Sequence, residues 1–404
     1  MPKVAFTPTM NTTLLITLNG SDRPGVTSRL FGILAGHRLT VLDIEQVVIR
    51  GKLVLGVLLT PEGPALDLTG IHHAVSELAD ELGLTAEITT GRGGRPSGAG
   101  GRRGRLHVTL LGSPLTPGAI ATIAGQIAAR GANIDRIGRL AQRPVTCIEL
   151  DVSGGDPEVL RADLARAALD HGVDVAVQRG GLYRRAMRLI VMDVDSTLIQ
   201  DEVIDLLADR AGCAIQVAKV TEAAMRGELD FGASLAERVA LLAGLSASAL
   251  DDVRAQLRLT PGARTLIATL KRLGYKFGIV SGGFSQVIAP LAETLGIDYV
   301  LANTLEIADG KLTGRVTGPV IDRAGKAAAL RRFAAQAGVP LSQTVAVGDG
   351  ANDLDMIATA GLGVAFNAKP LVRDAADTSV SFPHLDAILY LLGIPHDDVE
   401  PVEG

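Results

Sequence analysis

The sequence predicts an α/β protein in which two ferredoxin-like βαββαβ units precede a Rossmann-like domain with a helical cap. Residues 12–90 and 105–178 repeat one order of strands and helices, with turn glycines and aspartates at matching positions. Later in the chain, three apolar strand-like runs each end in polar residues. That second pattern is typical of a buried parallel sheet with a ligand site at the carboxyl ends of its strands.

The composition is that of a globular protein. The 404 residues are 47% hydrophobic and 21% charged, and the net charge of −5 argues against a general nucleic-acid binder, which needs a basic footprint. No apolar run approaches the roughly 20 residues that span a bilayer, and the N-terminus has no signal-peptide core. Cys147 and Cys213 are too far apart in sequence for a CxxC metal clamp and too few for a disulfide framework. We expect a cytoplasmic protein that binds neither nucleic acid nor membrane.

A glycine- and arginine-rich segment divides the chain. Residues 91–105 read GRGGRPSGAGGRRGR and hold no large apolar side chain, which is typical of a flexible linker. Contact of its arginines with RNA or a membrane is the less favoured interpretation. The predicted division is a first repeat at 1–90, a linker at 91–104, a second repeat at 105–180, a third domain at 186–394 with a cap at about 200–260, and a flexible acidic tail at 395–404.

Each repeat is expected to form a strand, a glycine turn and a helix, followed by two strands, a helix and a last strand. In the first copy the opening helix has one apolar face, formed by Val26, Leu30 and Leu34. The later predicted elements of the two copies are strands at 53–59 and 145–152, helices at 71–82 and 157–169, and strands at 86–90 and 173–178. This order is that of a ferredoxin-like unit.

Each copy resembles an ACT domain, a small amino-acid-sensing module, in its strand–turn–helix with Pro-Gly before the first helix. The resemblance implies that the turns at Gly25 and Gly118 let a small amino acid approach backbone N–H groups at a helix N-terminus, with serine as the expected effector. A plain tight turn explains both glycines equally well. Unpaired sheet edges in such domains predict a homodimer.

The polar residues that carry chemistry follow the three apolar strands of the third domain. The strands are predicted at 189–192, 276–280 and 344–348, and Lys326 opens a helical run between the last two. The polar residues are Asp193 and Asp195 after the first strand, Ser281 and Gly282 after the second, and Asp349, Asn352 and Asp353 after the third.

This set fits phosphoryl transfer to a carboxylate. Asp193 is the expected nucleophile, and Asp195 is expected to protonate the leaving alkoxide and then to deprotonate the attacking water. Mg²⁺ held by Asp193, the Asp195 carbonyl and Asp349 would supply countercharge. Lys326 and the Ser281 hydroxyl are expected to hold the oxygens of the transferring group. From outside the metal's ligand shell, Asp353 is expected to orient the metal-bound waters.

These motifs resemble those of the haloacid-dehalogenase-like superfamily. They are DxDxT at 193–197, Ser-Gly-Gly at 281–283, Lys326, and GDGxND at 348–353. Within that superfamily the second aspartate of the first motif favours a phosphatase or phosphomutase.

The segment between Thr197 and Pro261 predicts a helical cap that closes over the site and excludes water. Its helices are expected at 203–211, 215–225 and 234–242. Glu202 and Arg238 are charged residues in this segment, and a solvated helix face is the ordinary interpretation of such residues.

The spacing of the residues at 193–202, 225–231 and 234–238 resembles that of the phosphoserine phosphatase family. This resemblance implies that Glu202 receives the substrate's ammonium group and Arg238 its carboxylate. It also implies that Met225 and Phe231 form an apolar lid and that Asn352 contacts the substrate beside the metal.

We therefore expect Mg²⁺-dependent hydrolysis of O-phospho-L-serine to L-serine and phosphate through an aspartyl-phosphate, the last step of serine biosynthesis. The alternatives are a phosphotransferase, a broader phosphomonoesterase or phosphoprotein phosphatase, and an amino-acid sensor with a vestigial catalytic domain. The complete set of catalytic residue types disfavours the sensor.

Overall fold

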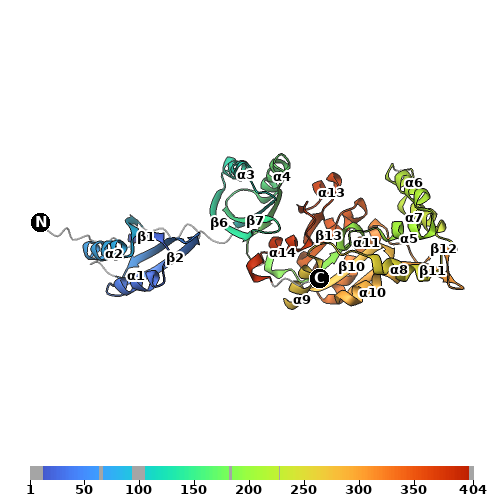
Figure 1. Cartoon of the computed structure of the whole chain (residues 1–404). Helices are drawn as coiled ribbons and strands as arrows, with labels where there is room; N and C mark the ends of the chain where they lie inside the picture. Colours follow the sequence, from blue (N-terminus) through green and yellow to red (C-terminus); the bar gives the residue numbers. More distant parts are fainter. Residues whose placement is uncertain (1–11, 63–66, 93–104, 182–183, 227, 400–404) are drawn as a thin grey trace. The chain divides into compact units, whose positions relative to one another are not determined.

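The computed structural model describes residues 12–62, 67–92, 105–181, 184–226 and 228–399 (Figure 1). The chain forms two compact units, Met1–Arg103 and Gly104–Gly404. Of the predicted linker, residues 93–104 lie outside the described residues, and Gly91 and Arg92 end a strand. No helix among the described residues is long and apolar enough to span a membrane.

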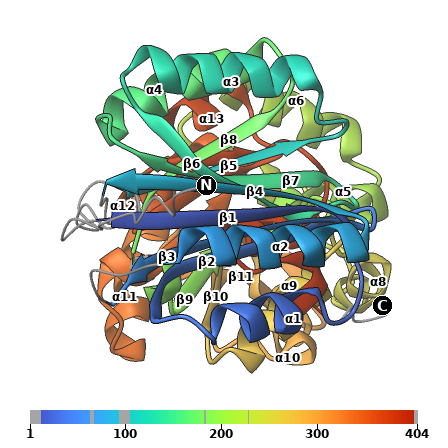
Figure 2. The same ribbon diagram turned by 90° about the vertical axis from the view of Figure 1, so that its left-hand side faces the viewer.

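The first unit is one βαββαβ domain, as predicted. Its antiparallel sheet has the strand order β2-β3-β1-β4, and alternate residues of β1 pack on one face of each helix. The helices α1 and α2 lie side by side (Figure 2). The elements are β1 (Thr12–Ser21), α1 (Val26–Leu34), β2 (Leu39–Ile49), β3 (Lys52–Pro61), α2 (Leu68–Leu82) and β4 (Leu84–Arg92).

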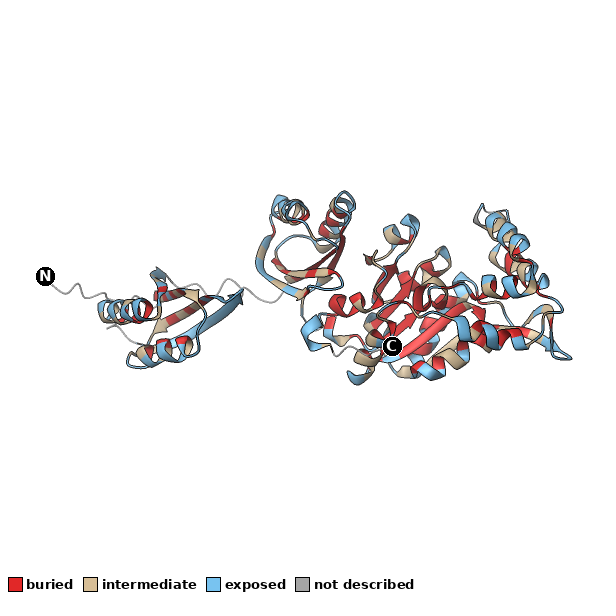
Figure 3. Cartoon of the chain, viewed as in Figure 1, coloured by how far each residue is buried: buried red, intermediate tan, exposed pale blue. Residues whose placement is uncertain are grey.

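The edge strand β2 is exposed along most of its length (Figure 3). Its exposed apolar side chains are Val41, Leu42, Ile44, Val47, Val48 and Ile49. A long apolar edge strand offers unpaired backbone groups to another chain.

The second unit begins with a βαββαβ domain of the same strand order, β6-β7-β5-β8. Its elements are β5 (Arg105–Gly112), α3 (Pro117–Ala129), β6 (Asn133–Ala141), β7 (Thr146–Ser153), α4 (Pro157–Leu169) and β8 (Asp174–Arg179). The two glycines singled out in the repeats differ. Gly25 precedes α1 with φ 93°, a left-handed conformation that favours glycine, whereas Gly118 lies in the first turn of α3 without a positive φ.

The rest of the second unit is the predicted Rossmann-like domain. Its seven-stranded sheet has the order β12-β11-β10-β9-β13-β14-β15 and is parallel except for the β11–β12 hairpin. The strands are β9 (Leu189–Met192), β10 (Lys276–Phe284), β11 (Tyr299–Ala308), β12 (Lys311–Thr317), β13 (Thr344–Gly348), β14 (Leu362–Phe366) and β15 (Thr378–Val380).

The cap helices α5 (Val203–Ala211), α6 (Ala214–Met225) and α7 (Phe231–Ala240) follow the predicted ones closely, and α8 (Ser248–Gln256) is an additional helix. The other helices are α9 (Ala263–Arg272), α10 (Ser285–Leu295), α11 (Arg323–Ala337), α12 (Leu354–Thr359), α13 (Pro370–Ala375) and α14 (Ile388–Leu391).

Polar contacts attach the second βαββαβ domain to the Rossmann-like domain. The buried carboxylate of Asp174, at the start of β8, accepts hydrogen bonds from the Ser379 hydroxyl at 2.7 Å and from the backbone N–H of Ser381 at 2.6 Å. Beside it, the Thr378 hydroxyl donates to the Val175 carbonyl at 3.3 Å. These bonds satisfy buried polar groups across the junction, so separating the domains would expose or orphan them.

The structure describes the first five residues, 395–399, of the tail that the sequence predicts to be flexible. Residues His396–Asp398 form a short 3₁₀ turn, and Val399 packs against the main core. The Tyr390 hydroxyl lies 3.3 Å from His396 Nδ1. Val399 is half-buried, and the contact of Tyr390 with His396 joins the segment to α14. Residues 400–404 lie outside the described residues.

Candidate active site

Three neighbouring strands bring the catalytic candidates to one edge of the sheet. Strand β9 pairs with both β10 and β13, so the residues that follow or end these strands meet at their carboxyl ends. They include Asp193 after β9, Ser281 within β10 and Asp349 after β13. Beyond Asp193 the chain forms one irregular turn, in which Ser196 adopts φ 56°. An uncommon left-handed conformation in a non-glycine residue is often found where a functional site constrains the backbone.

Lys326 lies fully buried between two carboxylates. Its Nζ is 2.6 Å from Asp193 Oδ2 and 2.8 Å from Asp353 Oδ1. Burial alone lowers the pKa of an ammonium group, but the charges of Asp193 and Asp353 outweigh it and raise the Lys326 pKa above its ordinary value. The lysine therefore stays positively charged beside the proposed nucleophile.

Three carboxylates converge beside this lysine. Asp193, Asp349 and Asp353 each place an oxygen within 4.8 Å of the others. Burial, followed by the charge of Asp353, raises the pKa of Asp349 to about 6 and also raises that of Asp193. Carboxylate oxygens crowded in this way fit a hard divalent cation, which would relieve their repulsion.

Asp195 is held by two hydrogen bonds that fix its direction. Its Oδ1 accepts from the backbone N–H of Val203 at 2.9 Å, and its Oδ2 accepts from the Ser281 hydroxyl at 3.0 Å. Burial raises the pKa of this carboxyl, which suits a group that must both give and take a proton. The Ser281 hydroxyl, expected to face the transferring group, here faces Asp195.

The cap reaches the site through Phe231 and Glu202. A Cβ added to Gly282 would lie 3.0 Å from the Phe231 ring, so this ring lies directly on the glycine. Glu202 precedes α5, and its Oε1 accepts from the Ser196 hydroxyl at 2.8 Å. Glu202 is exposed as a whole residue, but desolvation of its carboxyl by the surrounding groups, with the charge of Asp195 second, raises the Glu202 pKa to about 7.

Arg238 lies half-buried in α7 and donates from Nε to the Ser234 carbonyl at 3.2 Å. Burial lowers its pKa, and the negative charges of Glu202, Asp205 and Asp195 oppose that shift. The guanidinium thus lies within electrostatic reach of these three carboxylates. Asn352 is half-buried in the turn after β13, and Met225 ends α6 with its side chain outside the described part of the structure.

Two residues position the site in ways that the sequence did not show: Asn303 was not predicted at all, and Thr197 was noted only as part of the DxDxT motif. Asn303 is buried on β11, where its Nδ2 donates to the Gly282 carbonyl at 2.8 Å and its Oδ1 accepts from the Ile321 N–H at 2.9 Å. It therefore supports the Ser-Gly-Gly segment from behind. Thr197 donates from its hydroxyl to Asp349 Oδ1 at 3.2 Å. Asn303 could have been noticed in the sequence as a single asparagine in an otherwise apolar strand, because a buried polar side chain needs hydrogen-bond partners.

Comparisons with known proteins agree with this geometry. The haloacid dehalogenase-like hydrolase family model matches residues 190–358, and two ACT-domain models match residues 12–89 and 106–178. A phosphoserine phosphatase of Streptomyces coelicolor is 61% identical over 394 residues, covering 97% of this chain and 94% of that protein. This chain belongs to the phosphoserine phosphatase family.

Other members of the phosphoserine phosphatase family support the assignment. The Mycobacterium tuberculosis phosphoserine phosphatase is 52% identical over 97% of this chain and 95% of its own length. A probable phosphoserine phosphatase from Vibrio cholerae, solved without ligand, has 38% identity and a TM-score of 0.57, and the match covers 72% of this chain and 87% of that one. The predicted class of enzyme is confirmed: the chain is a phosphoric monoester hydrolase with two ACT domains and a haloacid-dehalogenase-like core.

Proposed function

We propose that this enzyme hydrolyses O-phospho-L-serine to L-serine and phosphate through an aspartyl-phosphate on Asp193, as the last step of serine biosynthesis. The observation that carries the proposal is the buried contact of Lys326 with Asp193, next to Asp195 at the same sheet edge. A carboxylate nucleophile, a fixed cation and a second, proton-bearing carboxyl are what this reaction needs.

The steps follow from the positions of these side chains. An Asp193 oxygen attacks phosphorus as the bond from phosphorus to the serine oxygen breaks, and Asp195 gives its proton to that oxygen. Asp195 then takes a proton from water, which attacks phosphorus and releases phosphate from Asp193. Throughout, the Lys326 ammonium lies beside the negative charge that collects on the transferring group.

The carboxylates of Asp193 and Asp349, with the Asp195 backbone carbonyl, would hold a Mg²⁺ ion, while Asp353 orients its waters. Their hard oxygen donors fit this cation. When bound, the ion supplies charge neutralisation that lets an anionic nucleophile approach a phosphate dianion.

The substrate's amino-acid part would lie between the cap and the sheet edge. Glu202 would receive the ammonium group and Arg238 the carboxylate, while Phe231 and Met225 would cover the apolar side. Gly282 and Asn352 would contact the substrate near phosphorus. The mutual electrostatic reach of Glu202 and Arg238 supports this pairing of opposite charges for a zwitterion.

Phosphate release from a panel of phosphomonoesters tests the function. We expect O-phospho-L-serine to be preferred at least tenfold over glycerol phosphate, phosphothreonine and a phosphopeptide, with activity lost in EDTA and restored by Mg²⁺. Similar rates on all four would leave a broad phosphatase and contradict the zwitterion pocket. Added glycerol or homoserine tests for phosphotransfer, which would appear as their phosphorylated products.

The raised pKa of Glu202 predicts a pH-dependent specificity. Glu202 is ionised above its pKa of about 7, so kcat/KM for phosphoserine should fall as the pH drops from 8 to 6. Glu202→Gln should raise KM about tenfold or more and remove this part of the profile. Glycerol phosphate, which has no ammonium group, is the matched control, because protonation of the catalytic carboxyls affects both substrates alike. Identical pH profiles for the two substrates in the wild type would contradict the role of Glu202.

The ACT domains would provide dimerisation and a site for an amino-acid effector, with serine bound near the turns at Gly25 and Gly118. The long exposed β2 strand is the edge that we expect to pair between two chains. Light scattering at micromolar concentration should give a dimer for the wild type and a monomer for Val48→Lys. Ile215→Lys, at an exposed position on α6, is the control and should stay dimeric. A monomeric wild type would refute the prediction.

A further inference from the structure

Two short segments connect the cap to the Rossmann-like domain, and they lie side by side. The chain enters the cap through residues 198–201, the entry segment, and leaves it through residues 257–260, the exit segment. One antiparallel bridge joins them, and beside it the backbone N–H of Gln200 donates to the Arg258 carbonyl at 2.9 Å. The position of the cap over the site therefore depends in part on how these two segments are held together.

The carboxylate of Asp201 links the entry segment to the exit segment through three hydrogen bonds. Its Oδ2 accepts from the backbone N–H of Arg258 at 2.8 Å, and its Oδ1 accepts from Arg258 Nε at 3.1 Å and Nη2 at 2.6 Å. The Asp201 side chain is only 7% exposed, whereas that of Arg258 is 67% exposed. Burial by itself would raise the Asp201 pKa, but the hydrogen bonds and charge of Arg258 lower it below its ordinary value. The carboxylate is therefore ionised at neutral pH and fixed in direction.

The backbone of Asp201 belongs to a loop that bonds to itself beside the catalytic carboxylates. The Ser196 N–H donates to the Asp201 carbonyl at 3.4 Å, and the Ser196 hydroxyl donates to Glu202 Oε1 at 2.8 Å. One residue further, the Val203 N–H donates to Asp195 Oδ1 at 2.9 Å. Ser196 has its left-handed φ of 56° within this loop. Asp201 thus connects the loop that carries Glu202 to the exit segment.

Glu202 follows Asp201 directly, so the direction of its side chain depends on how Asp201 is held. We propose that Asp201, fixed by Arg258, is a positioning residue that keeps Glu202 directed at the ammonium group of the substrate. This role rests on the function proposed above for Glu202. Asp201 itself would not touch the substrate, because Arg258 occupies both of its carboxylate oxygens. A small displacement of a charged contact weakens binding steeply, so loss of this support should appear as a higher KM.

Steady-state kinetics of Asp201→Ala with phosphoserine and glycerol phosphate, at pH 8 where Glu202 is ionised, test the proposal. We expect KM for phosphoserine to rise about tenfold, with kcat lowered less than about threefold, because the missing support weakens substrate binding rather than the chemistry. Glycerol phosphate lacks an ammonium group, and its kcat/KM should change less than about threefold. Asp201→Asn keeps an oxygen acceptor for the Arg258 N–H and should recover part of the loss.

A double-mutant cycle with Glu202→Gln shows whether the effect passes through Glu202. In the Glu202→Gln background, Asp201→Ala should raise KM for phosphoserine less than about twofold further, since the carboxylate that it positions is already gone. Independent effects of the two changes, with increases in KM that multiply, would overturn the proposal.

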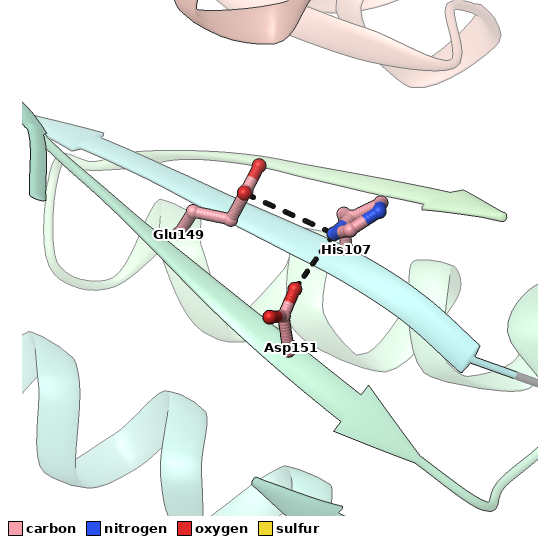
Figure 4. Close-up of side chains that lie close together, drawn as sticks. All are labelled: His107, Glu149 and Asp151. Carbon is pink, nitrogen blue, oxygen red and sulfur yellow. Dashed lines mark hydrogen bonds and ion pairs between the residues drawn. The ribbon is translucent and has the colours of Figure 1, made fainter. Parts of the chain in front are cut away.

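Glu149→Gln is the matched control for the loss of a partly buried ion pair (Figure 4). Glu149 pairs with Arg184, whose side chain is 6% exposed, so one partner is buried as in the pair at the cap. Its neighbours in Figure 4 are His107, with Nδ1 3.9 Å from Glu149 Oε1, and Asp151, with Oδ1 2.8 Å from the same nitrogen. All four residues lie outside the cap and its connecting segments. Glu149→Gln should therefore lower stability without changing the preference for phosphoserine over glycerol phosphate.

Thermal unfolding checks that each variant is folded, and Arg258→Ala extends the test to an exposed residue. This variant removes two of the three hydrogen bonds to Asp201, and it should raise KM for phosphoserine about threefold or more even if Asp201→Ala does not fold. Folded variants with the wild-type KM, or with an equal loss of kcat/KM on both substrates, would overturn the positioning role while the effect of Glu202→Gln stands. If Glu202→Gln itself keeps the wild-type KM, the function proposed for Glu202 fails, and this inference fails with it.

Discussion

Asp193→Asn should lower kcat by at least about a thousandfold while the protein stays folded. The amide has nearly the same shape as the carboxylate but cannot act as the nucleophile that forms the acyl phosphate. Stability should change little or increase, because burial and the charge of Asp353 already disfavour a charged Asp193. Steady-state kinetics and thermal unfolding measure the two effects.

Acid quenching gives an independent readout of the same prediction. Wild-type enzyme mixed with ³²P-labelled phosphoserine should retain label in the peptide that contains Asp193, and Asp193→Asn should retain none. Asp355→Asn is the control, since Asp355 forms an exposed ion pair with Arg323 beyond the strand ends. Undiminished turnover in Asp193→Asn would disprove the assignment of the nucleophile.

Lys326→Met should abolish measurable turnover and also destabilise the fold by about 3–5 kcal/mol at neutral pH. Methionine keeps the length of the side chain but leaves Asp193 and Asp353 buried without their countercharge. Burial and the charge of Asp353 already raise the Asp193 pKa, and the loss of the Lys326 charge, which opposes them, would raise it further above its unfolded value. The destabilisation should therefore be small near pH 3, below the unfolded aspartate pKa of about 3.9, and should grow as the pH rises through that value.

Denaturant unfolding of Lys326→Met from pH 3 to pH 8 measures this dependence. Lys276→Met is the matched control, because Lys276 pairs with Asp298 at 2.9 Å on the surface, and its loss should have little effect on stability at any pH. Added Mg²⁺ should restore part of the stability of Lys326→Met by neutralising the same carboxylates. A destabilisation of equal size at all pH values would show that packing, rather than charge, explains the effect.

The candidate active site could be located from the sequence because its residues follow from local rules. Apolar runs such as Leu189–Met192 form buried parallel strands, and parallel strands place their following residues at one edge. Both rules can be applied without knowing which residues far apart in sequence are in contact. The repeated βαββαβ pattern could be predicted for the same reason, since the periodicities of strands and helices are local.

The hydrogen-bond partners of the site residues could not be predicted from such local rules. The bond from Ser281 to Asp195, the support of Gly282 by Asn303, and the attachment of Asp174 to β15 each join polar groups far apart in sequence. Such pairs depend on the distance and angle between elements, which hydrophobic patterning does not encode. The packing of Val399 could not be predicted either, because the core that it contacts is formed by residues far away in the sequence.

The sequence by itself determined the domain order, the class of sheet and the residues that can carry phosphoryl transfer. Tertiary structure alone decided that Lys326 bridges two carboxylates and that Ser281 faces Asp195. The order of the domains, the class of sheet and the candidate residues depend on chain connectivity and on hydrophobic periodicity, which act over a few residues. The side-chain contacts depend on burial, charge and hydrogen-bond geometry, which act between elements that are packed together but far apart in sequence.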